Sequence, residues 1–174
     1  MILRYFYLDG YNSVAQNLDV NLGGKYKFYF LRDKKTLNIV EDNMYVNNLY
    51  KDYSVISDIS AILGKNSAGK TTVLRMINSV FNGFSRKEKY IVLFETEDKF
   101  ILYTNFESLL FEATKLCKKL QFIKKADFNP IDELQNVGLI YFSNIFDKAT
   151  PFQGNANLID ISINFTFENF YKEK

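Results

Sequence analysis

Apolar and polar residues alternate along much of the chain, in the pattern typical of β-strands with one buried face. In the first third, residues 3–8 predict a first strand, and the alternation runs through 26–30 and 37–39, on either side of the polar stretch 32–35. The last two runs predict a β-hairpin. We therefore expect residues 1–45 to form mainly an antiparallel β subdomain.

The period changes in the middle of the chain. Residues 59–63 form a short apolar run that predicts a strand, and they lead directly into a loop that contains two glycines. Beyond the loop, residues 70–81 place apolar side chains on one helical face, and Gly83 is positioned to cap the end of that helix. Residues 59–83 therefore predict a strand, a loop and a helix, in that order.

The second half of the chain shows both periods. Residues 90–94 and 100–103 predict another β-hairpin. An apolar stripe over residues 106–120 predicts an amphipathic helix, and Thr104 and Glu107 have the spacing of a capping box at its start. We expect this helix to pack on a sheet.

Two further strands are predicted near the end of the chain. Residues 138–142 form a buried apolar run, and residues 159–167 alternate with a regular period of two. We expect residues 1–174 to form a single domain, with a central sheet around the strand at 59–63.

The composition indicates a folded globular protein and narrows the classes of function. Hydrophobic residues make up 47% of the chain, and no apolar run approaches the roughly 18 residues needed to cross a bilayer. The 22 basic and 20 acidic residues give a formal net charge of +2, so charge does not support binding to DNA or to a membrane. Cys117 is the single cysteine and histidine is absent, which excludes an internal disulfide and the commonest zinc ligand. We expect a cytoplasmic protein.

The loop after residues 59–63 carries the candidate chemistry. It fits the pattern G-x-x-x-x-G-K-[ST], which arises by chance in on the order of one per cent or fewer of chains this long. Glycines are needed because backbone N–H groups must turn toward phosphate oxygens without side chains in the way. Lys70 would neutralise the β- and γ-phosphates of a nucleotide, and the Thr71 hydroxyl would ligate Mg²⁺. The motif is Gly64-Lys65-Asn66-Ser67-Ala68-Gly69-Lys70-Thr71.

Residues 64–78 resemble the Walker A segment of ABC-type ATPases, particularly the group that contains RecF, SMC and OLD (overcoming lysogenization defect) proteins. Asn66, third in the loop, and the run Thr71-Thr72-Val73-Leu74 carry the resemblance. It implies an α/β P-loop NTPase lobe, the N-terminal half of an ABC-type head, that binds ATP with Mg²⁺. It also implies that a second head pairs with the first as a homodimer in the complete protein. The implied nucleotide-binding residues are Gly64, Asn66, Ser67, Ala68, Gly69, Lys70, Thr71 and Thr72, with Thr71 as the metal ligand.

The motifs that complete hydrolysis in ABC-type ATPases are absent or changed. Such proteins often place a Gln after a strand like that predicted at 138–142, whereas this chain has Ser143 and Asn144, and Asn144 is the candidate for the same role. Residues 131–133 contain Asp-Glu without a preceding apolar run, and no LSGGQ-like signature is present. We therefore expect the second half of the ATPase to lie far downstream, and this chain alone to bind ATP without appreciable hydrolysis.

Two alternatives remain open for the same motif. The first is a non-catalytic subunit whose bound nucleotide stabilises an assembly with a partner that carries the remaining motifs. The second is a small P-loop kinase, which would need a lid with clustered arginines. The arginines of this chain are Arg4, Arg32, Arg75 and Arg86, and they are not clustered after the predicted P-loop helix. The resemblance favours DNA repair, chromosome maintenance or defence against phage as the process served.

Overall fold

The structure is a computed structural model, and the chain folds as two compact units. The structure describes residues 1–11, 15–46, 59–63, 65, 69–82, 88–96, 99–113, 122–125, 139–141 and 158–160. Each unit is discontinuous in sequence. The first unit comprises Met1–Lys65 and Ser85–Phe128, and the second comprises Asn66–Phe84 and Asn129–Lys174.

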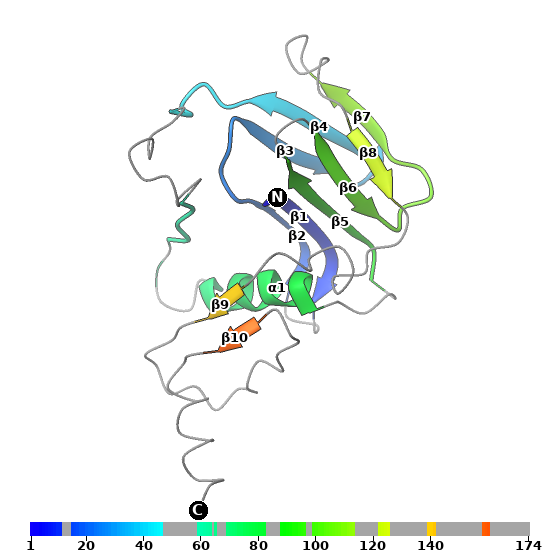
Figure 1. Cartoon of the computed structure of the whole chain (residues 1–174). Helices are drawn as coiled ribbons and strands as arrows, with labels where there is room; N and C mark the ends of the chain where they lie inside the picture. The colour runs from blue at the N-terminus through cyan, green and yellow to red at the C-terminus, as the bar shows by residue number, and fades with distance from the viewer. Residues whose placement is uncertain are drawn as a thin grey trace, which may run out of the picture. The chain divides into compact units, whose positions relative to one another are not determined.

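The first unit contains a five-stranded sheet with the strand order β2-β1-β5-β6-β8 (Figure 1). Neighbouring strands are antiparallel, except for β6 and β8, which are parallel. The strand predicted at residues 3–8 and the hairpin predicted for 90–94 with 100–103 are confirmed. The strands are β1 (Ile2–Tyr11), β2 (Ala15–Asn21), β5 (Tyr90–Glu95), β6 (Phe100–Thr104) and β8 (Phe122–Lys125).

A three-stranded sheet with the order β3-β4-β7 completes the first unit. Its strands are β3 (Tyr26–Leu31), β4 (Thr36–Glu41) and β7 (Leu110–Ala113). The antiparallel hairpin of β3 and β4 is confirmed, with Phe28 opposite Ile39, while β7 lies parallel to β4. The two hairpins of residues 1–45 are thus antiparallel but belong to different sheets, and strands from after residue 84 complete both sheets.

An aromatic core holds the two sheets of the first unit together. Tyr5 and Tyr7 of β1 meet Phe28 and Phe30 of β3, with ring centroids 5.8 Å and 4.7 Å apart, respectively. Phe100 of β6 also packs on Phe28, with their ring centroids 5.6 Å apart. Each fully buried large apolar side chain contributes about 1.5–3 kcal/mol. The other core residues are Leu37, Ile39, Ile91, Leu93, Leu102 and Leu109.

Polar side chains of β2 connect the edge of one sheet to the edge of the other. The side-chain amide of Asn21 donates to the carbonyl of Phe28 and accepts from the N–H of Phe28, both at 2.8 Å. Asp19 Oδ2 accepts from the N–H of Phe30 and from the hydroxyl of Tyr5, both at 3.3 Å. These side chains form hydrogen bonds with backbone groups of β3, as a neighbouring strand would do. We call this connection the β2–β3 seam.

The turn between β2 and β3 depends on glycine. Gly23 and Gly24 have φ angles of 73° and 97°, in the region that L-residues rarely adopt. Gly24 also lies against Arg4, because a Cβ atom on Gly24 would come within 3.0 Å of Arg4 Nε. Arg4 is buried, and its Nε donates to Glu95 Oε2 in an ion pair that links β1 to the end of β5.

The second unit contributes helix α1 (Lys70–Asn82) and two short parallel strands, β9 (Leu139–Tyr141) and β10 (Leu158–Asp160). The helix predicted at 70–81 and the strand predicted at 138–142 are confirmed. The alternating strand predicted at 159–167 is confirmed at its start, and its remainder lies outside the described residues. No helix in the described part of the chain has the length and apolar character needed to cross a membrane.

The prediction of an α/β fold is wrong. The described residues form antiparallel and mixed β-sheets with one helix of 13 residues, which differs from the helix-rich P-loop NTPase lobe expected of the N-terminal half of an ABC-type head. The helix predicted over 106–120 is also wrong at residues 106–113, of which 110–113 form β7, and residues 114–120 lie outside the described part of the chain. Thr104 caps no helix; its hydroxyl donates to the carbonyl of Tyr90. Pairing with β4 outweighed the helical spacing of the apolar residues, because tertiary context overrides local preference.

Candidate phosphate-binding site

Gly69 and the first turn of α1 form the described part of the glycine motif. The φ angle of Gly69 is 86°, and a Cβ atom there would meet nothing within 4 Å. The backbone conformation, not lack of space, therefore requires glycine at this position. The carbonyl of Gly69 accepts from the N–H of Val73 at 3.0 Å, which closes the first turn of the helix.

The N-terminal end of α1 has the features of an anion-binding terminus. Its first N–H groups have no partner within the helix, and Gly69 has no side-chain oxygen that could accept from them. The first turn begins with Lys70 and contains no acidic residue. A cation beside the positive end of the helix dipole costs about 0.3–1 kcal/mol, and a bound anion would offset this cost.

The accessible half of α1 is its N-terminal half. Thr71 is exposed and Lys70 is partly exposed, whereas Met76 and Val80 are fully buried further along the helix. Burial of the C-terminal half anchors the helix, while the hydroxyl of Thr71 remains available to solvent or to a ligand. The position predicted to hold Mg²⁺ is thus accessible.

The strand predicted immediately before the loop is wrong. Residues 59–63 form no strand, and the side chains of Ile59 and Leu63 are 56% and 90% exposed. A described contact of this segment is made by Ser60, whose hydroxyl donates to the carbonyl of Leu22 at 2.8 Å. The central strand of the five-stranded sheet is instead β5, which pairs with β1 and β6.

Several predicted site residues lie outside the described part of the chain. These are Gly64, Asn66, Ser67 and Ala68 of the loop, Ser143 and Asn144 after β9, and the acidic pair at residues 132–133. Lys65 is described and exposed. The structure therefore shows the last three residues of the motif, Gly69 to Thr71, followed by Thr72, at the start of a helix.

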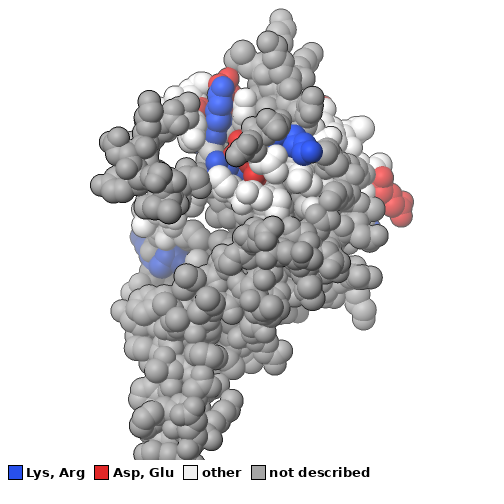
Figure 2. Space-filling view, in the orientation of Figure 1, with Lys and Arg blue, Asp and Glu red and all other residues white. Residues whose placement is uncertain are grey.

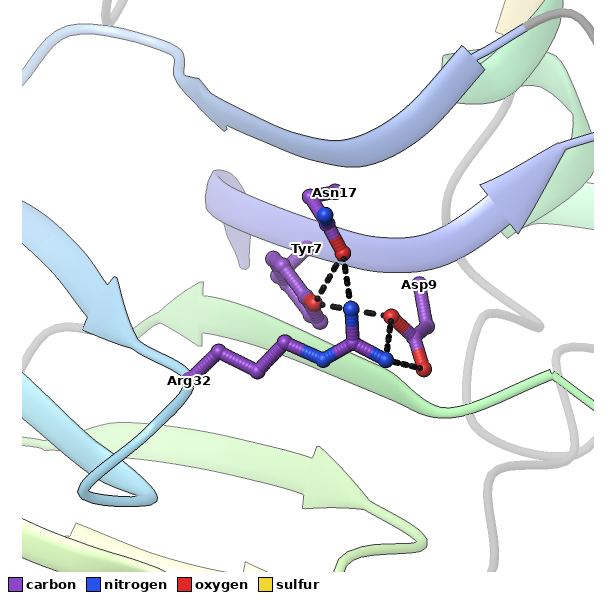
Figure 3. Close-up of polar contacts among 4 residues, drawn as sticks. All are labelled: Tyr7, Asp9, Asn17 and Arg32. Carbon is purple, nitrogen blue, oxygen red and sulfur yellow. Dashed lines mark hydrogen bonds and ion pairs between the residues drawn. The ribbon is translucent and has the colours of Figure 1, made fainter.

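A polar cluster in the first unit was not predicted from the sequence (Figure 3). Arg32 Nη2 lies 3.0 Å from each carboxylate oxygen of Asp9, and Arg32 Nη1 donates to Asn17 Oδ1 at 2.9 Å. The hydroxyl of Tyr7 lies 3.1 Å from Asp9 Oδ1 and 3.2 Å from Asn17 Oδ1, so it can donate to either oxygen. The cluster ties β1, β2 and the end of β3 together.

The electrostatics of this cluster favour a structural role. Burial and the neighbouring Asp9 carboxylate raise the pKa of Tyr7 to about 12, so the hydroxyl remains a donor at neutral pH. Arg32 neutralises Asp9. The members come from positions 7 to 32 without a recognisable spacing. Asn17 has a φ angle of 54°, a conformation that Asn tolerates better than most residues, but one sequence does not reveal this requirement.

Two ion pairs lie on the surface beside the hairpin of β3 and β4. Lys25 Nζ lies 3.1 Å from Glu41 Oε1, and Lys27 Nζ lies 3.0 Å from Asp42 Oδ2. The hydrogen bond from Lys27 holds the pKa of Asp42 below its ordinary value. In the upper part of Figure 2, blue and red side chains of described residues lie close to one another.

The described residues include no group of three or more His, Cys, Asp or Glu side chains that could hold a metal ion. A comparison with protein-family models, curated proteins and solved structures finds no match to this chain. The assignment of a function therefore depends on the residues of the motif and on the local geometry around them.

Proposed function

We propose that residues 64–72 bind the phosphate groups of ATP or ADP together with Mg²⁺. The observation that carries the proposal is the start of α1. There, a glycine with positive φ leads into a helix that begins with Lys70 and Thr71 and has no acidic residue in its first turn. This arrangement favours an anion at the helix terminus, and the order of residues matches the G-x-x-x-x-G-K-[ST] pattern.

Each residue of the site has a distinct role in the proposal. The backbone N–H groups from Gly64 to Gly69 surround the phosphate oxygens, and the ammonium group of Lys70 neutralises the β- and γ-phosphates. The hydroxyl of Thr71 ligates Mg²⁺, and Thr72 belongs to the nucleotide-binding set by resemblance to ABC-type ATPases. Asn66, Ser67 and Ala68 complete the loop by the same resemblance.

Binding without turnover is the expected behaviour of this chain. Phosphoryl transfer needs groups that position water and stabilise developing charge in addition to those that hold the phosphates. In the proposal, these groups and a second ATPase head belong to the complete protein. We also propose a cytoplasmic location, where ATP is available and the single Cys117 stays reduced.

Titration of the purified chain with a fluorescent ATP analogue tests the proposal. Wild-type protein should bind saturably and more tightly with Mg²⁺, and phosphate release measured in the same samples should stay at background. Lys70→Ala should abolish this binding while leaving the far-ultraviolet circular dichroism and the urea midpoint unchanged. Lys34→Ala is the matched control, because Lys34 is an exposed lysine in the turn between β3 and β4.

Two results would overturn parts of the proposal. If Lys70→Ala binds the analogue as tightly as wild-type protein, residues 64–72 are not the phosphate site. If the wild-type chain releases phosphate continuously and Lys70→Ala does not, the site is correct but the expectation of binding without hydrolysis is wrong.

The metal ligand can be tested separately from the phosphate site. Thr71→Ser keeps the hydroxyl and should keep the Mg²⁺-dependent part of the affinity, whereas Thr71→Ala should lose that part and retain weaker, Mg²⁺-independent binding. The measurement is the ratio of dissociation constants with and without Mg²⁺. Equal ratios for the two variants would exclude Thr71 as the ligand.

A further inference from the structure

We draw no further inference here: the strongest candidate, the outer face of the three-stranded sheet where Tyr29, Leu31, Val40 and Leu110 are exposed, carries none because nothing in the described part of the structure shows what covers it.

Discussion

Replacing Asn21 with Ala should weaken the β2–β3 seam measurably. Asn21 makes two hydrogen bonds to one residue, accepting from the N–H of Phe28 and donating to its carbonyl, both at 2.8 Å. Phe28 is 1% exposed and its ring packs on Tyr5 and Phe100 in the core. Alanine at position 21 leaves the N–H and the carbonyl of Phe28 without these hydrogen bonds. Because Phe28 is buried, water cannot freely replace them.

The expected loss follows from these two bonds. A hydrogen bond of this kind contributes about 1 kcal/mol net, and an unsatisfied buried group costs about 1–3 kcal/mol. We therefore expect Asn21→Ala to lower the free energy of unfolding by about 2 kcal/mol, which corresponds to about 4–8 °C in the melting temperature for a chain of this length. Such a value is a large share of the stability of an ordinary domain, which is about 5–15 kcal/mol.

Urea denaturation provides the assay, followed by circular dichroism and by tyrosine fluorescence, because the chain has 12 tyrosines and no tryptophan. Gln16→Ala is the matched control, since Gln16 is an exposed amide on the same strand and should change stability by less than about 0.5 kcal/mol. If Asn21→Ala and Gln16→Ala unfold at the same urea concentration, the side chain of Asn21 does not hold the two sheets together.

Two other predictions concern the same region. Gly24→Ala should destabilise the protein by about 1–3 kcal/mol in urea denaturation, because a side chain at φ 97° is strained and its Cβ atom would meet Arg4 at 3.0 Å. Gly10→Ala, which has open space for a Cβ atom, should be close to neutral, and similar losses for both variants would contradict the reasoning. Asp19→Asn keeps an acceptor for the N–H of Phe30 and removes a carboxylate whose pKa desolvation raises above 3.8. A raised pKa means that the wild-type protein loses stability as pH rises through it, so the urea midpoint of Asp19→Asn minus that of wild type should increase from about pH 3 to about pH 7, and a constant difference would refute this assignment.

The sequence was sufficient to predict most strands of the first unit. Alternation at residues 26–30 and 37–39 identifies strands with one buried face, and the polar turn between them predicts that they pair. The mainly apolar run at 3–8 identifies a strand whose side chains are all buried. The hairpin of β5 and β6 was predicted for the same reason. Each strand was identified from its own pattern of apolar residues. Each predicted pairing joins two strands that are close together in sequence.

Pairings between distant segments could not be predicted. β1 pairs with β5, about 90 positions away, and β4 pairs with β7 across more than 70 positions. Residues 110–113 carry apolar side chains at a spacing that suits a helix, and only their parallel register with β4 makes them a strand. The run at 59–63 was predicted as a strand from its apolar residues, but it forms none. A short apolar run does not by itself distinguish a strand from other structure, because a strand also needs a neighbour to pair with.

The candidate site depends on a different kind of information from the sheets. A phosphate site of this type needs only consecutive residues, since glycines give the loop its shape, the helix supplies N–H groups and dipole, and Lys70 follows directly in sequence. The positive φ of Gly69 and the start of α1 at Lys70 agree with that local requirement even though the surrounding fold differs from the one predicted. The cluster of Tyr7, Asp9, Asn17 and Arg32 has the opposite character, because its members meet only when three strands are in place. For this reason the nucleotide proposal can be tested by substitutions within residues 64–72, independently of how the sheets are arranged.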